Sequence, residues 1–285
     1  MSDTPDFLTQ MALSSAARVA HAKNALPDLE DRLQNLPMPP KLVLSPAGFD
    51  LIMELKLASP AYGSLANSSL DLQAQVLAYA RAGAAAVSVL TEPSRFQGDL
   101  LHLSRAAEVL APSAVPAMRK DFLVDPYQLL EARLCGASGV LLIVRMLTDE
   151  SLSTLLSQAR RLGLFVLLET FDEIDIKRAQ SHASSWTADK TQLLIGVNSR
   201  DLTTLKVVPD RLVQLASLLP MEHPRVAESG LVTAQDAAIL SAAGYNLALV
   251  GSALMASADP VALGGAMIEA GRAAACRRLS EGVYR

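Results

Sequence analysis

Two charged side chains stand inside an apolar run near the start of the chain, in "LIMELKL" at residues 51–57. Glu54 and Lys56 are two residues apart, so on a β-strand both side chains point to the same face. An acid and a base aimed together at one side can act in general acid–base catalysis. The question is why two charges are placed in what otherwise has the pattern of a buried strand.

Polar residues stand at the ends of most other apolar runs as well. They are Ser88 with Thr91 and Glu92, Arg119 to Asp121, Glu169, Asn198 with Arg200 and Asp201, Glu228 to Gly230, and Gly251 with Ser252. Taken singly, each charge fits an ordinary solvated strand end or a structural ion pair about as well. Two lysines and three glutamates that end strands on one face favour acid–base chemistry on a charged substrate.

The elements that must position these residues are eight short apolar runs. They lie at 50–56, 85–91, 115–120, 139–144, 164–169, 193–198, 224–229 and 247–251. Each of the first seven is followed by a segment with helix signals, and residues 260–279 supply a final helix. This alternation predicts a parallel sheet covered by helices. Eight units in about 235 residues fit an α/β fold of the (β/α)8 TIM barrel type, in which the carboxyl ends of the strands meet at the active site. A doubly wound open sheet is the alternative, but no Gly-x-Gly-x-x-Gly follows the first run.

An additional segment precedes the barrel. Residues 7–26 have the pattern of an amphipathic helix, and the Pro-rich residues 35–48 connect it to the first strand. We therefore expect a helical extension and linker at 1–48 and a catalytic barrel at 49–285.

Composition excludes several classes of protein. With 51% hydrophobic and 19% charged residues, the chain is globular rather than disordered, and a net charge of −4 gives no footprint for nucleic acid. Asp3 and Asp6 stand where an export signal needs basic residues, and Cys135 and Cys276 lie far apart, which fits a reducing cytoplasm. The uncharged stretch 237–258 has the pattern of helix, turn, strand and loop rather than of a membrane span. We expect a monomer or weak homo-oligomer.

Small-residue turns follow the last two strands, "ESG" at 228–230 and "VGSA" at 250–253. Backbone N–H groups at such turns, together with a helix N-terminus, form the phosphate site that is common in this fold. Glycine lets the backbone approach the phosphate oxygens closely. The alternative, that these glycines only make tight turns, is weaker because both turns fall after strands seven and eight.

Five segments resemble the signatures of the indole-3-glycerol phosphate synthase family. They are "ELKLASP", "SVLTEPSRFQGDL", "MRKDFLVDPYQLLEARLCGASGVLLIV", "IGVNSRDLTTL" and "ESGLVTAQDAAIL" with "ALVGSALM". The similarity runs in order through nearly all of residues 50–260 and extends more weakly to the N-terminal helix. It implies an enzyme of tryptophan biosynthesis that closes the pyrrole ring of 1-(2-carboxyphenylamino)-1-deoxyribulose 5-phosphate with loss of carbon dioxide and water. It also implies no metal and no organic cofactor, which agrees with four scattered histidines and no His-Glu-x-x-His.

The resemblance assigns catalytic roles to matching positions. Lys120 is implied to be the general acid of ring closure, and Glu169 and Glu54 the carboxylates that transfer protons in dehydration. Lys56 is implied to contact the phosphate or carboxylate region and to take part in the acid step. How the acid work divides between Lys56 and Lys120 stays open.

The same resemblance assigns binding roles. Asn198 and Glu228 are implied to orient the hydroxyls and the anthranilate portion of the substrate, and Arg200 to hold loop or carboxylate charge. The phosphate side is implied to consist of Ser59, Ser229, Gly230, Gly251 and Ser252. The apolar slot for the aromatic ring is implied to consist of Phe96, Phe122 and Leu141, although such residues more often belong to a plain core.

The chain departs from the family pattern beside these positions. Ala61 and Tyr62 replace a Ser and a Lys after Pro60, Thr170 and Phe171 replace a Val-His-Asp continuation, and the N-terminal helix carries Ser15 and Arg18 at its charged positions. Two alternatives to the standard synthase follow. One is a diverged paralogue acting on a related anthranilate-derived phosphate. The other is a catalytically silent barrel kept as a binding subunit, which the presence of Lys120 and Glu169 disfavours.

Overall fold

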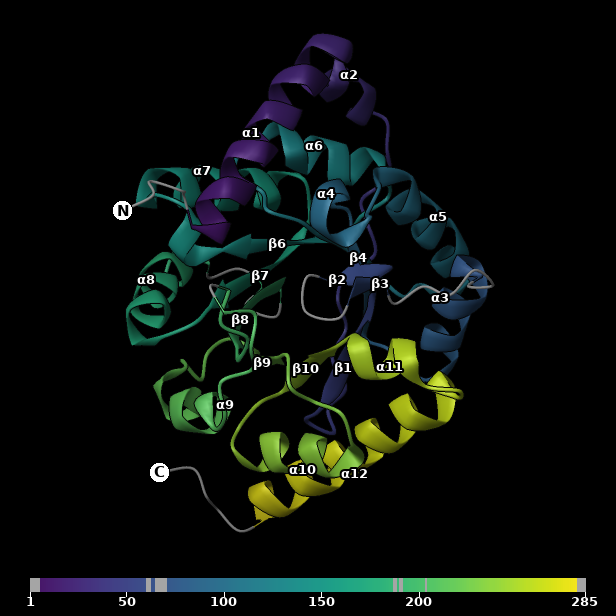
Figure 1. The fold of residues 1–285 in the computed structure, drawn as a ribbon, viewed down its shortest axis with the longest axis vertical. Helices are drawn as coiled ribbons and strands as arrows, with labels where there is room; N and C mark the ends of the chain where they lie inside the picture. The colour runs from purple at the N-terminus through teal and green to yellow at the C-terminus, as the bar shows by residue number, and fades with distance from the viewer. Residues whose placement is uncertain are drawn as a thin grey trace.

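The computed structural model describes residues 6–59, 63–64, 71–186, 189, 192–202 and 204–280, and its centre is a closed barrel of eight parallel strands (Figure 1). The strands are β1 (Asp50–Leu55), β4 (Ala86–Leu90), β5 (Ala117–Lys120), β6 (Gly139–Ile143), β7 (Phe165–Thr170), β8 (Leu193–Asn198), β9 (Arg225–Glu228) and β10 (Leu247–Val250). They follow one another around the barrel in chain order, and β10 closes against β1. The predicted TIM barrel and all eight of its strands are confirmed.

Helices surround the barrel, one after each strand. They are α3 (Leu72–Arg81), α5 (Leu100–Leu110), α6 (Tyr127–Leu134), α7 (Asp149–Arg161), α8 (Glu173–Ala183), α9 (Arg211–Leu215), α10 (Ala234–Ala242) and α12 (Pro260–Ser280). Five of these helices, α3, α5, α7, α8 and α10, begin with a side-chain cap. Thr148 accepts a hydrogen bond from Ser151 N–H at the start of α7, and Thr233 and Asp236 form a capping box at the start of α10. Within the described chain, no helix has the length and apolar character needed to cross a membrane.

Several short elements were not predicted. β2 (Ala58–Ser59) and β3 (Gly63–Ser64) form a two-stranded antiparallel ribbon after β1, and α4 (Pro93–Phe96) follows β4. The stretch 237–258 comprises the end of α10, strand β10 and the short helix α11 (Ser252–Ala256), which stands where its pattern indicated a loop.

Two layers of apolar side chains hold the barrel together. Inside it, residues at alternate strand positions pack against one another, among them Ile52, Met118, Phe165 and Val226. A larger cluster fills the space between the strands and the helices. Burying one such side chain contributes roughly 1.5–3 kcal/mol. These side chains fill the interior of the barrel. The inward-facing residues nearest the carboxyl end of each strand therefore lie beyond this packed layer, at the end of the barrel where active sites form in this fold.

The predicted N-terminal helix is α1 (Phe7–Ala25), followed by α2 (Leu29–Leu33), and it packs on the barrel near α6 (Figure 1). Arg18 makes two hydrogen bonds to Asp121, at 2.8 and 3.0 Å, and Ser15 Oγ accepts one from Gln128 Nε2 at 2.8 Å. Both positions depart from the family pattern, and both contact the barrel. We keep residue 48 as the proposed boundary between extension and barrel.

Candidate active site

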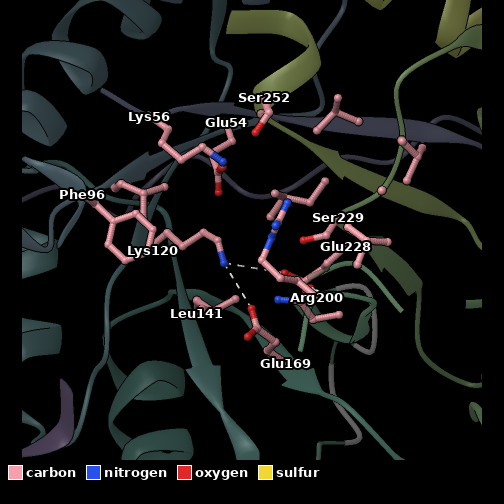
Figure 2. Close-up of a pocket in the computed structure, with 18 of the residues that line it drawn as sticks. Glu54, Lys56, Phe96, Lys120, Leu141, Glu169, Arg200, Glu228, Ser229 and Ser252 are labelled. Atoms are coloured by element: carbon pink, nitrogen blue, oxygen red, sulfur yellow. Dashed lines mark hydrogen bonds and ion pairs between the residues drawn. The ribbon is translucent and has the colours of Figure 1, made fainter. Parts of the chain in front are cut away.

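A cavity of about 320 Å³ opens at the carboxyl ends of the barrel strands (Figure 2). Its lining includes fourteen of the fifteen predicted site residues: Glu54, Lys56, Phe96, Lys120, Phe122, Leu141, Glu169, Asn198, Arg200, Glu228, Ser229, Gly230, Gly251 and Ser252. The fifteenth, Ser59, belongs to the short strand β2, and its side chain lies outside the described part of the structure, as do Ala61 and Tyr62. Eight strands of one barrel therefore bring residues from the whole chain into a single site.

Lys120 lies among carboxylates from alternate strands. Its Nζ donates a hydrogen bond to Glu169 Oε2 at 3.1 Å and lies 3.8 Å from Glu228 Oε2 (Figure 2). Burial lowers the pKa of Lys120, but the charges of Glu169, Glu228 and Glu54 raise it well above its ordinary value. Lys120 is therefore held as a cation, which is the form that a general acid needs before reaction.

Glu228 has few polar partners. It is 1% exposed, and neither carboxylate oxygen has a hydrogen-bond partner within the described structure. Burial raises the pKa of Glu228, the nearby charge of Glu169 raises it further, and Lys120 only partly offsets them. The pKa of Glu228 therefore lies well above its ordinary value of 4.5.

The opening question about β1 has a geometric answer. Glu54 and Lys56 point into the same cavity, and Lys56 Nζ lies 2.8 Å from Glu54 Oε1. Burial raises the pKa of Glu54, but the charges of Lys56 and Lys120 and the hydrogen bond from Lys56 outweigh it, so the pKa lies below its ordinary value. The two charges form an ionised pair at the end of the first strand.

The turns after β9 and β10 differ from one another. Ser229 and Gly230 have left-handed φ angles of 67° and 85°, and the next helix, α10, begins only at Ala234 because its capping box starts at Thr233. Residues 231–233 therefore separate the first turn from its helix. The second turn leads directly into a helix, since Ser252 is the first residue of α11 and its N–H has no partner within that helix.

Arg200 and Asn198 are joined in the loop after β8. The Arg200 N–H donates to Asn198 Oδ1 at 2.9 Å, and the Arg200 guanidinium donates to the Leu205 carbonyl at 2.7 Å. These bonds hold the Arg200 guanidinium at the cavity edge.

The apolar wall of the cavity is larger than predicted. Phe96 and Phe122 lie with ring centroids 6.2 Å apart. Sequence reasoning missed further apolar lining residues: Leu90, Ile143, Leu202, Val207, Leu231, Val232, Leu249 and Val250. Strand alternation was the available signal for three of them, because Leu90, Ile143 and Leu249 each stand two residues from another inward position.

Some strand-end charges serve the framework instead. Glu92 accepts hydrogen bonds from three backbone N–H groups at the start of α4. Buried Arg119 bonds Asp121 at 3.1 Å and Glu131 at 3.0 Å. Burial raises the pKa of Asp121, but Arg18 and Arg119 outweigh this effect and lower the pKa to about 2.

Among the described residues, no group of three or more His, Cys, Asp or Glu side chains is arranged to hold a metal ion.

Comparisons with known proteins agree with this geometry. The family model described as indole-3-glycerol phosphate synthase matches residues 8–263. The indole-3-glycerol phosphate synthase of Koribacter versatilis is 42% identical over 76% of this chain and 78% of its own, and that of Mycobacterium ulcerans is 39% identical over 95% and 92%.

Solved structures support the fold. A 3-hexulose-6-phosphate synthase has a TM-score of 0.57 at 15% identity, with 78% of this chain and 99% of that chain covered. The 3-hexulose-6-phosphate synthase of Salmonella typhimurium has a TM-score of 0.56 at 12% identity, with 78% and 97% covered. At this identity the likeness concerns the barrel alone. The family model and the relatives go further, and by them this chain belongs to the indole-3-glycerol phosphate synthase family.

Proposed function

We propose that this protein is an indole-3-glycerol phosphate synthase, a carboxy-lyase that converts 1-(2-carboxyphenylamino)-1-deoxyribulose 5-phosphate into indole-3-glycerol phosphate, carbon dioxide and water. The observation that carries the proposal is the contact of Lys120 with Glu169 and Glu228 inside a cavity with one apolar wall. Family membership names the reaction, and this cluster supplies the acid and the bases it needs.

Ring closure is the step assigned to Lys120. The ring carbon that bears the carboxylate attacks the C2′ carbonyl carbon, and the carbonyl oxygen takes a proton from the Lys120 ammonium group. Loss of carbon dioxide then returns the electron pair of the broken bond to the ring. A well-placed general acid contributes typically about 10²–10⁴-fold to the rate.

Dehydration is assigned to the remaining acid–base groups. The C2′ hydroxyl leaves as water after it takes a proton, and a carboxylate removes a proton from C1′, so that the ring double bond forms. We propose that Glu169 acts as this base and that the Glu54–Lys56 pair, 2.8 Å apart, moves the second proton. This division leaves ring closure to Lys120, whose Nζ contacts the carboxylates deeper in the cavity.

The remaining groups are proposed to bind the substrate. The apolar wall around Phe96, Phe122 and Leu141 would contact the aromatic ring, and Ser229, Gly230, Gly251 and Ser252 would contact the phosphate. Asn198, Arg200 and Glu228 would orient the portion between them. We place the reaction in tryptophan biosynthesis in the cytoplasm, carried out by a monomer or weak homo-oligomer without a cofactor.

Neither alternative function gains support from the described departures. Thr170 Oγ1 bonds the buried Gly196 carbonyl at 2.7 Å, and the Phe171 ring lies 4.4 Å from Arg145, outside the cavity lining. These substitutions alter the framework and leave the acid–base groups in place.

A direct assay tests the proposal. Purified protein given the carboxyphenylamino-deoxyribulose phosphate should release fluorescent indole-3-glycerol phosphate. The gene should also restore growth to a tryptophan auxotroph that lacks the synthase. Folded protein without turnover, together with failed complementation, would refute the proposed activity.

A further inference from the structure

A glycine on β8 lies directly against the Glu228 carboxyl group. An added Cβ at Gly196 would lie 2.4 Å from Glu228 Oε1 and 3.0 Å from Leu167 Cδ1. Because its φ lies outside the left-handed range, Gly196 is not needed for backbone freedom. What glycine provides here is space, and the Glu228 carboxyl occupies it.

The backbone at Gly196 is fixed. The residue lies in the middle of β8 and pairs with Glu169 of β7 and Val226 of β9. Its carbonyl oxygen also accepts the buried hydrogen bond from Thr170 Oγ1. A side chain at this position therefore cannot be relieved by a shift of the strand, so the Glu228 carboxyl would have to move.

Glu228 has little else to hold it. Neither of its carboxylate oxygens has a hydrogen-bond partner in the described structure, and the Lys120 ammonium group lies 3.8 Å away. Packing against Gly196 therefore contributes to the position of this carboxyl group.

The same arrangement recurs on the other side of the cavity. An added Cβ at Gly251 would lie 2.4 Å from Glu54 Oε1, again between neighbouring strands. Glu54 is also held by Lys56 at 2.8 Å, so it depends less on its glycine. The repeated pairing of a cavity glutamate with a glycine indicates that the space itself is part of the site.

We infer that Gly196 is a positioning residue of the active site: the space left by its missing side chain fixes the Glu228 carboxyl group beside Lys120. The catalytic consequence rests on the proposed function, whereas the contact itself does not.

A thermal-unfolding cycle tests the contact. Gly196→Ala should lower the Tm of the otherwise unchanged protein but lower it much less, or not at all, in a Glu228→Ala background, where the new methyl group fills vacated space. The contact of the new methyl group with Leu167 is present in both backgrounds, so it cancels when the two changes in Tm are subtracted. An equal loss of Tm in both backgrounds would overturn the inference.

Two other glycines provide matched controls. Gly139→Ala meets the buried Phe165 ring at 2.4 Å, so it should lower the Tm equally in both backgrounds. Gly265→Ala, inside α12, meets no atom within 4 Å outside its own helix backbone, so it should leave activity unchanged and raise the Tm slightly and equally in both backgrounds.

Kinetics test the consequence. Displacing Glu228 by about 1 Å should reduce kcat/KM on the order of 10²-fold in Gly196→Ala, measured on folded protein below its Tm. Gly139→Ala should retain far more activity at equal distance from its own Tm. Unchanged kcat/KM in Gly196→Ala would refute a positioning role. A wild type without turnover would refute the proposed function instead and leave the unfolding cycle to decide the contact.

Discussion

Lys120 on β5 and Glu169 on β7 are separated by strand β6, yet Lys120 Nζ lies 3.1 Å from Glu169 Oε2. The contact exists because inward side chains at the ends of alternate strands converge in a closed barrel. Burial opposes the charge on Lys120, and the surrounding carboxylates more than restore it. Lys120 is therefore held as a proton donor in hydrogen-bond contact with Glu169.

Replacing Lys120 tests its assignment as the acid. Lys120→Ala should reduce kcat by about 10²–10⁴-fold, because the carbonyl oxygen loses its proton donor. Binding of the product's phosphate end should change little, since Ser229 and Ser252 are untouched. Steady-state kinetics and a titration with product measure the two effects. Lys23→Ala, at an exposed lysine on α1, is the control, and wild-type turnover in Lys120→Ala would assign the acid elsewhere.

Because the pKa of Glu228 is raised, replacing Glu228 by a neutral residue should stabilise the folded protein. Its folded pKa lies above the ordinary value of 4.5, so the protein loses stability as pH rises from about 4.5 through the folded pKa. Glu228→Gln removes this loss. The Tm of Glu228→Gln should match that of the wild type near pH 4 and exceed it increasingly toward pH 8, while kcat/KM falls. A wild type that is the more stable protein at pH 8 would contradict a raised pKa for Glu228.

Much of this site could be predicted from strand periodicity. Glu54 and Lys56 share a face because they are two residues apart, and Lys120, Glu169 and Glu228 end predicted strands. Each of these positions depends only on the local pattern and on the rule that barrel sites form at carboxyl ends.

The contacts between distant segments could not be predicted in the same way. Arg18 and Asp121 are 103 residues apart, and their pairing depends on where α1 packs. The sequence does not distinguish Gly196 from any other strand glycine. Its role depends on the direction of the Glu228 side chain on the neighbouring strand, which only the structure shows. The start of α10 could be predicted locally, because Thr233 and Asp236 have the spacing of a capping box.

The Arg18–Asp121 pair predicts an acid-dependent part of the stability. Asp121 has a folded pKa of about 2 against an ordinary 3.8. The ionised Asp121 carboxylate therefore contributes on the order of 2 kcal/mol to the free energy of unfolding. This contribution is present in full above about pH 4 and is lost as pH falls toward 2. Arg18→Ala should lower the free energy of unfolding at pH 7 by part of that amount, because Arg119 and Thr91 still contact Asp121, and it should flatten the slope between pH 4 and 2.

Denaturant unfolding across this pH range measures both effects. Lys23 lies on the same helix as Arg18 and forms an exposed ion pair with Asp125. Lys23→Ala should therefore lower the free energy of unfolding by at most about 1 kcal/mol. Equal losses in the two variants would show that the buried pair contributes no more than a surface one.

The turn after β9 predicts a variant that loses affinity rather than chemistry. Gly230 has φ 85°, and a Cβ there would lie 3.2 Å from Ser199 Oγ, which itself donates to the Ser229 carbonyl at 3.0 Å. Gly230→Ala should therefore strain the turn by about 1–2 kcal/mol and displace the backbone proposed to bind phosphate. KM and the inhibition constant of inorganic phosphate should both rise, with kcat nearly unchanged because Lys120 and Glu169 lie on other strands. Gly83→Ala, with φ 89° and no place in the cavity lining, carries the same backbone strain and should keep the wild-type KM. If both variants raise KM alike, the effect comes from general destabilisation and the turn does not bind the phosphate.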